Sequence, residues 1–77
     1  MIPLLIYGTE GCHLCELALE LVTPLIDTRC TLNQLDISED DELIERYGIR
    51  IPVIKRLDNN AELGWPFDQE QLLAFIA

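Results

Sequence analysis

The apolar positions of this chain form short blocks whose spacing alternates between strand-like and helix-like patterns. Residues 3–7, Pro-Leu-Leu-Ile-Tyr, are continuously apolar and end at a glycine, which predicts a short buried strand. From Leu14 to Leu25 the apolar residues recur at steps of three and four, the pattern of an amphipathic helix. Pro24 predicts that this helix ends near Thr23.

The same alternation continues in the middle of the chain. Residues 29–35 alternate in part between apolar and polar positions and predict a second strand. Ser38 and Asp41 then resemble a capping box, with Ser38 as the N-cap of a short second helix.

The last third of the chain predicts two strands and a helix. Pro52 precedes a run rich in β-branched residues, and Asp58-Asn59-Asn60 is typical of a turn. Residues 61–65 can therefore return antiparallel as a hairpin strand. Asp68 and Gln71 have the spacing of a capping box for the final helix.

This order, β-α-β-α-β-β-α, predicts an α/β fold. The first βαβ unit requires a right-handed crossover between two parallel strands. The closing hairpin adds antiparallel strands, so we expect a four-stranded mixed sheet with helices on both faces. Its 77 residues predict one domain, spanning 1–77.

The charge of the chain bears on its partners. Fourteen acidic against five basic residues give a net charge of −9. Nucleic acids and anionic membranes are bound by clustered Lys and Arg, so we expect neither as a partner. We expect a soluble monomer.

The cysteine count and the N-terminus bear on the compartment. Three cysteines are an odd number, whereas short secreted proteins with a disulfide framework normally carry an even set. The apolar start is short and lacks a basic flank, which argues against a signal peptide. No apolar run approaches the length of a membrane span. We expect a cytoplasmic protein.

The chemistry of the chain is concentrated at Cys12 and Cys15. This CxxC pair lies between the first strand and the first helix, at a helix N-terminus that stabilises a thiolate. Cys12 at the mouth of the helix is the expected nucleophile, and Cys15, one turn further on, is the expected resolving thiol. We expect His13 to tune the thiol pKa and the reduction potential, making the disulfide more oxidising; the alternative is an exposed side chain that tunes nothing.

The chain resembles a thioredoxin-fold protein of the glutaredoxin-like kind, and most of all the short bacterial glutaredoxin-like proteins with a Cys-His-Leu-Cys site. The residues that carry this resemblance are Cys12-His13-Leu14-Cys15, Ile51-Pro52 and the junction at 64–68. The resemblance implies a thiol–disulfide oxidoreductase that transfers electrons between thiols and binds no cofactor. It also implies that Ile51-Pro52 is a cis peptide facing the cysteines, where substrate binds.

The chain departs from glutaredoxins at six residues whose positions contact glutathione in that family. His13-Leu14 stands where the family has Pro-Tyr, and Arg50 where it has Thr. Trp65-Pro66 stands at its Gly-Gly, and Glu10 replaces a Lys before the first cysteine. Glutathione is therefore a weakly supported co-substrate. The substrates are protein or small-molecule disulfides, and the thiol donor is left open.

Several residues admit two interpretations. We expect Arg50 to bind a carboxylate of the substrate or to be a solvated surface residue. Trp65 is either a core residue or the rim of the substrate groove. Cys30 fits a buried and inert thiol, with a redox sensor or a third metal ligand as the alternative.

Two other functions compete with the oxidoreductase. The first is a metal or iron–sulfur carrier, in which Cys12 acts with Cys15, His13 or a dimer mate; such sites normally use four ligands. The second is a binding module that keeps the fold without turnover.

Overall fold

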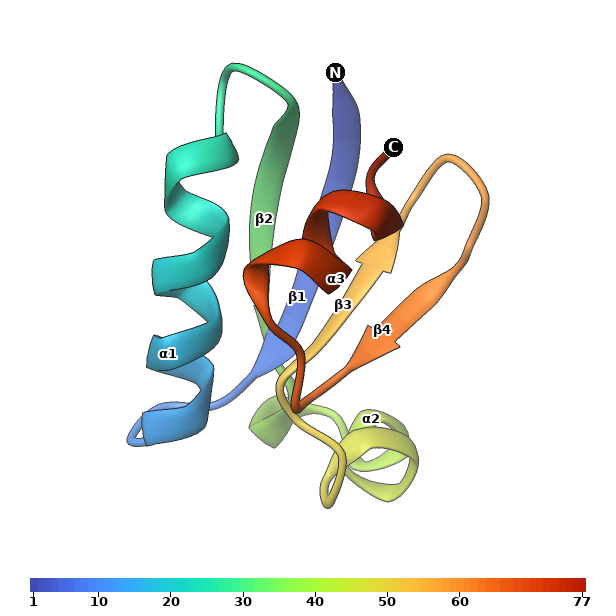
Figure 1. Ribbon diagram of the computed structural model, residues 1–77. Coiled ribbons are helices and arrows are strands. Elements are labelled where there is room, and N and C mark those ends of the chain that lie inside the picture. Colours follow the sequence, from blue (N-terminus) through green and yellow to red (C-terminus); the bar gives the residue numbers. More distant parts are fainter.

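The computed structural model describes all 77 residues, and a four-stranded sheet forms its centre (Figure 1). In chain order the elements are β1 (Ile2–Gly8), α1 (His13–Val22), β2 (Cys30–Asp36), α2 (Asp41–Tyr47), β3 (Val53–Arg56), β4 (Glu62–Gly64) and α3 (Gln69–Phe75). This is the predicted order β-α-β-α-β-β-α. None of the helices combines the length and apolar character needed to span a membrane.

The strands lie in the order β2-β1-β3-β4, so β1 is an inner strand with neighbours on both sides. β1 pairs in parallel with β2 through the α1 crossover and antiparallel with β3, and β3 pairs antiparallel with β4. The predicted mixed sheet is confirmed. The continuous apolar run of β1 has a physical cause: Leu4 and Ile6 are buried on one face of the sheet and Tyr7 on the other.

The larger core lies between the sheet and the helices α1 and α3, which share one face (Figure 1). Its buried members are Leu4, Ile6, Ala18, Val22, Leu25, Cys30, Ile54, Phe67, Leu72 and Ile76. The predicted capping box of α3 is present, because Asp68 Oδ1 accepts from the Gln71 amide (2.8 Å) and Gln71 Oε1 accepts from the Asp68 amide (2.9 Å). The cap fixes where α3 begins, directly after the buried Phe67.

The opposite face has a smaller core of four buried residues: Tyr7, Ile37, Tyr47 and Val53. Tyr47 comes from α2, which lies beyond one end of the strands in Figure 1. The expectation of helices on both faces therefore holds, although α2 covers only the end of its face that lies next to the loop after β1.

The predicted cap of the second helix is wrong. Ser38 lies in a 3₁₀ turn, Ile37–Glu39, because its amide is held by Asp36 Oδ1 at 2.8 Å. The helix begins later, at an N-cap formed by Asp40, whose Oδ1 accepts from the amides of Glu42 (2.9 Å) and Leu43 (3.2 Å). Because Asp36 holds the Ser38 amide, the backbone forms a 3₁₀ turn at this point, and the α-helix begins only after Asp40.

The first helix ends as predicted. α1 stops at Val22, and Pro24 lies in a 3₁₀ turn, Thr23–Leu25, that follows it. Pro24 has no amide hydrogen to continue the helical pattern, which explains the change.

Candidate functional site

A tight turn carries the chain from the end of β1 to Cys12. β1 ends at Gly8, and Gly11 has a φ of +73°, in the left-handed region that glycine adopts without steric cost. Cys12 is then the N-cap of α1, with extended backbone angles. The sequence thus places a thiol where helices usually carry Ser, Thr, Asp or Asn.

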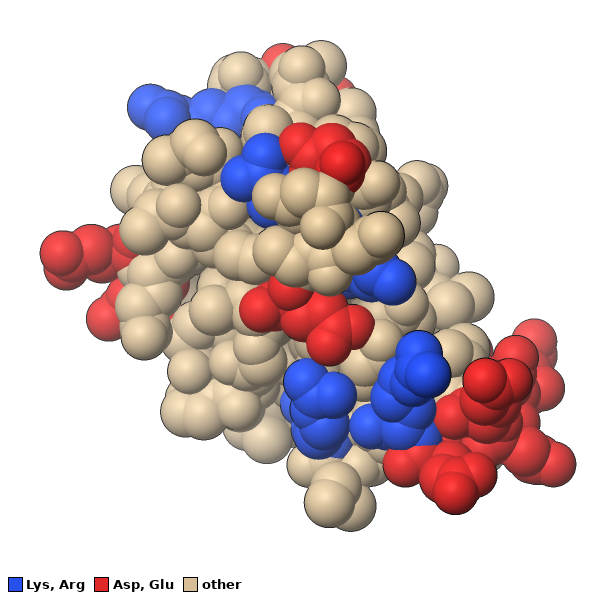
Figure 2. Space-filling model, turned by 90° about the vertical axis from the view of Figure 1, so that its right-hand side faces the viewer, with Lys and Arg blue, Asp and Glu red and all other residues tan.

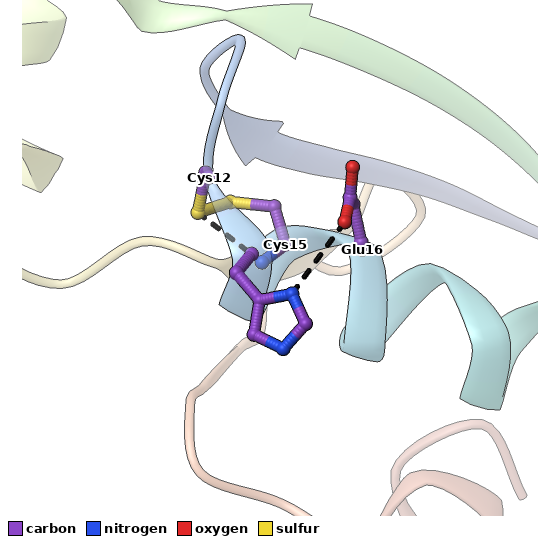
Figure 3. The surroundings of a disulfide bond; sticks show 4 residues. Cys12, Cys15 and Glu16 are labelled. Carbon is purple, nitrogen blue, oxygen red and sulfur yellow. Dashed lines mark hydrogen bonds and ion pairs between the residues drawn. A yellow bond between two sulfur atoms is a disulfide. The ribbon is translucent and has the colours of Figure 1, made fainter.

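Cys12 and Cys15 form a disulfide at this helix start (Figure 3). Cys12 Sγ accepts a hydrogen bond from the Cys15 amide at 3.2 Å, so sulfur replaces the usual capping oxygen. Cys12 is partly exposed, whereas Cys15 is buried with 7% of its surface accessible. Cys12 is therefore the more accessible of the two cysteines to an incoming group.

Gly8 also belongs to the site, although the sequence predicted it only as the end of the first strand. A Cβ atom added to Gly8 would lie 3.0 Å from Cys15 Sγ and 3.5 Å from Cys15 Cβ. Such a contact is too close for an unstrained carbon–sulfur pair. The absence of a side chain at Gly8 makes room for the buried sulfur.

A groove of about 580 Å³ opens beside the disulfide, between the start of α1 and the ends of β1 and β2. Three carboxylates line it: Glu10 from the turn, Glu16 from α1 and Asp36 from β2. Cys12 and Cys15 form part of its wall, and neither Lys nor Arg lines it. Its lining is Ile6, Gly8, Thr9, Glu10, Gly11, Cys12, Cys15, Glu16, Leu19, Gln34, Leu35 and Asp36. The groove is therefore negatively charged.

Asp36 remains ionised at neutral pH. Hydrogen bonds from the hydroxyl and amide of Ser38 lower the pKa of Asp36 below its usual value. Glu16 and Asp36 were not predicted from the sequence as site residues. Asp36 ends a parallel strand and Glu16 lies in the first turn of a helix, and these positions could have indicated them, because ligands of open α/β sheets bind at the carboxyl ends of the strands.

Ile51 and Pro52 lie at the same end of the sheet. Their peptide bond is cis, and Pro52 is fully buried. Tyr7 is paired with Val53, so the register places Pro52 opposite Gly8, the residue that contacts Cys15. Pro52 does not line the groove. The disulfide thus has the groove on its β2 side and the proline on its β3 side.

The backbone around Pro52 is partly occupied. The Ile51 amide donates to the Tyr47 carbonyl, and the Trp65 amide donates to the Pro52 carbonyl, both at 3.0 Å. The Ile51 carbonyl accepts no hydrogen bond from the chain. The Ile51 carbonyl is therefore available to a partner strand.

Arg50 is held in a polar cluster rather than in the groove. Its Nη2 atom lies 3.5 Å from Glu62 Oε1, and its guanidinium carbon lies 5.4 Å from the centroid of the Tyr47 ring. The Tyr47 hydroxyl donates to Glu62 Oε2 at 2.5 Å. Burial, followed by the hydrogen bond to Glu62, raises the pKa of Tyr47 to about 12.

Trp65 and His13 also lie outside the hydrogen-bond network of the disulfide. Trp65 packs edge-on against Phe67, with 5.1 Å between ring centroids, and lies against the larger core. His13 Nδ1 is 3.6 Å from Glu16 Oε2, and both side chains are exposed. No hydrogen bond joins His13 to either sulfur atom.

Cys30 is fully buried in the larger core, as expected. Its Sγ lies 3.5 Å from the Leu25 carbonyl oxygen. Burial, followed by the charge of Asp27, raises the pKa of the Cys30 thiol. The chain contains no group of three or more His, Cys, Asp or Glu side chains that could hold a metal ion.

Comparisons with known proteins agree with this geometry. Residues 3–77 match the Glutaredoxin-like domain (DUF836) family. The X-ray structure of protein XcR50 from X. campestris has 33% identity and a TM-score of 0.84, covering 95% of this chain and 93% of that one. Protein Ne2328 from Nitrosomonas europaea, solved by NMR, has 28% identity and a TM-score of 0.83, covering 99% and 92%.

A malarial protein with 19% identity and a TM-score of 0.72, covering 99% of this chain and 93% of that one, shares the fold alone. No curated protein matches the chain. The sheet order and these neighbours show the expected thioredoxin-like fold.

Proposed function

The chain belongs to the Glutaredoxin-like domain family, and from this premise we propose that it is a thiol–disulfide oxidoreductase. The observation that carries the proposal is the CxxC disulfide at the N-terminus of α1, with Cys12 accessible and Cys15 buried. Its substrates are disulfides of proteins or small molecules.

In the reduced protein, the thiols of Cys12 and Cys15 together give up two electrons. The Cys12 thiolate attacks one sulfur of a substrate disulfide, the Cys12–substrate bond forms, and the first substrate thiolate leaves and takes up a proton. Cys15 then loses its proton and attacks Cys12 Sγ. The second substrate thiolate leaves, and the Cys12–Cys15 disulfide remains. A dithiol or thiol donor returns the two electrons by the reverse exchange.

The helix N-terminus supports the first step. Cys12 Sγ already accepts the Cys15 amide hydrogen in the disulfide form, and a thiolate is a stronger acceptor at the same place. The unsatisfied amides of the first turn favour a negative charge there. These groups stabilise Cys12 both as attacking thiolate and as leaving group.

We place the substrate backbone against Ile51 and Pro52. The free Ile51 carbonyl supports this, because an extended substrate segment can donate one amide hydrogen to it. The Ile51 amide is engaged by Tyr47, so this contact is limited to one hydrogen bond. Trp65 and His13 remain predicted substrate-binding and tuning residues, and Arg50 keeps its two interpretations, a substrate contact or a surface residue.

Single serine variants test the proposal with a neutral probe, 2-hydroxyethyl disulfide. The protein is reduced, freed of reductant and mixed with the probe, and its mass is followed with time. We expect Cys12→Ser to form no adduct. We expect Cys15→Ser to stop as a mixed disulfide on Cys12, because no resolving thiol is present.

Cys30→Ser is the matched control, since it removes the third thiol without touching the pair. It should form the Cys12–Cys15 disulfide as the unmodified chain does. An adduct that forms as fast in Cys12→Ser as in Cys15→Ser, or none at all in Cys15→Ser, would disprove the assignment.

A further inference from the structure

We propose that the groove beside the disulfide selects substrate disulfides that lie in basic peptide segments. This inference rests on the proposed function, because it concerns the partner of the same Cys12. The groove has the disulfide in its wall and a volume of about 580 Å³, within the size range of sites that bind small ligands, roughly 300–1,000 Å³. A group that reaches Cys12 from this side is exposed to the charges of the lining.

Those charges are of one sign and come from three separate elements. Glu10 precedes Cys12 by two residues, Glu16 follows Cys15 directly, and Asp36 ends the neighbouring strand β2. In the close-up of the disulfide, Glu16 extends from α1 directly after Cys15 (Figure 3). The carboxylates therefore reach the groove from three elements instead of lying along one helix.

No Lys or Arg side chain lines the groove to neutralise these carboxylates. His13 is the one other titratable side chain of the motif, 3.6 Å from Glu16, and a proton on it would offset one of the three charges. Arg50 is paired with Glu62, and Arg56 with Asp58 at 2.8 Å. Figure 2 shows basic side chains gathered with acidic ones on the side of the molecule opposite α1.

This field opposes anionic substrates. A peptide disulfide with acidic neighbours brings negative charge next to three carboxylates, whereas Lys or Arg neighbours bring positive charge to the same place. Charges within a Debye length, about 10 Å at 0.1 M salt, interact with little screening. Such complementarity changes association rates and specificity more than it changes affinity.

The test uses three symmetric peptide disulfides that differ only in charge: Lys-Cys-Lys, Gln-Cys-Gln and Glu-Cys-Glu, each with blocked ends. The second-order rate of oxidation of the reduced protein is measured for each by rapid mixing. Each rate is divided by the rate of the same peptide with dithiothreitol, which corrects for the effect of neighbouring charge on disulfide reactivity itself.

At low salt we expect the corrected rate of the Lys peptide to exceed that of the Glu peptide by about tenfold or more, with the Gln peptide between them. At 0.5 M salt the ratio should fall to about two- or threefold. A ratio near one at low salt would overturn the inference.

Two variants separate the groove from the total charge. Glu10→Gln combined with Glu16→Gln and Asp36→Asn removes the three groove carboxylates and keeps their shapes. The matched control removes three exposed carboxylates outside the groove, through Glu42→Gln, Glu45→Gln and Glu70→Gln. The groove variant should lose most of the preference for Lys, while the control keeps it. Equal losses in both variants would overturn the role of the groove.

The two proposals fail in different ways. A reduced protein that forms no Cys12–Cys15 disulfide with any of the three peptides disproves the oxidoreductase. Equal corrected rates for all three peptides leave the oxidoreductase standing and disprove only the selection of basic segments.

Discussion

The two sides of the disulfide are built differently. On the β2 side, the groove is open, and its carboxylates make no ion pair with Lys or Arg. On the β3 side, the Ile51 amide donates to Tyr47 and the Trp65 amide donates to Pro52. Arg50 is held there by Glu62 and Tyr47. One side can therefore select a substrate by charge, while the other offers a fixed backbone edge.

Sheet order is the physical reason for this difference. β2 is an edge strand, so no further strand pairs with its outer side. The groove beside its last residue, Asp36, stays open. β3 is an inner strand between β1 and β4, and α2 packs against its start through Tyr47 and Val53. Neighbours on both sides close the proline side. The variants below test this contrast.

Gly8 joins the two sides and should give the largest effect on stability. In Gly8→Ala the new Cβ meets Cys15 Sγ at 3.0 Å, and a sulfur held in a disulfide cannot rotate away. We expect the oxidised protein to lose about 1–3 kcal/mol in its free energy of unfolding, as for other overpacked positions. The reduced protein should lose less, because the Cys15 thiol can change rotamer. Urea unfolding of both forms measures this.

Gly64→Ala in β4 is the matched control, since a Cβ there meets no atom within 4 Å. Its free energy of unfolding should change by less than about 0.5 kcal/mol. Equal losses for Gly8→Ala and Gly64→Ala, or equal losses in the oxidised and reduced forms of Gly8→Ala, would contradict the contact with sulfur.

Tyr47 tests the closed side. Tyr47→Phe removes the hydroxyl that donates to Glu62, and we expect a loss of about 1 kcal/mol in the free energy of unfolding. The pKa of Tyr47 is about 12 in the folded protein, above the ordinary value of 10. The folded state then keeps a proton that the unfolded state releases, so stability falls between pH 10 and pH 12.

Tyr47→Phe should show a shallower fall over the same range, measured by urea unfolding at fixed pH values. Tyr7→Phe, on the stacked neighbouring ring, should make the fall shallower by a smaller amount, because Tyr7 is a lesser cause of the raised pKa of Tyr47 than burial and Glu62. Identical pH profiles for the unmodified chain and Tyr47→Phe would show that Tyr47 is not the group responsible.

Arg50 should give the smallest effect. Its ion pair with Glu62 is partly exposed, and such pairs contribute about 0–1 kcal/mol. We therefore expect Arg50→Gln to lower the free energy of unfolding by less than about 1 kcal/mol and to leave the Lys-to-Glu peptide ratio unchanged. A ratio that rises because the Glu peptide slows would mean that Arg50 reaches the substrate, as the sequence first suggested.

The helices, the strands and the reactive cysteine pair could be predicted from the sequence. Apolar spacing along one strand or helix is local, so the run at 3–7, the α1 stripe and the capping box at Asp68 could be identified from neighbouring residues. The CxxC at a strand–helix junction is equally local. The predicted cap at Ser38 was wrong because Asp36 holds the Ser38 amide in a 3₁₀ turn and Asp40 caps the later amides of Glu42 and Leu43.

The surroundings of Cys12 and Cys15 depend on the tertiary structure. Glu10, Glu16 and Asp36 lie on three elements, and their convergence on one groove depends on the parallel pairing of β1 with β2 and the path of α1 over them. The contact between Gly8 and Cys15 and the capture of Arg50 by Glu62 likewise join residues that the chain separates. The charges of the side chains follow from the sequence. The electrostatic potential at Cys12 also depends on the distances to those charges, which are set by the packing of the fold.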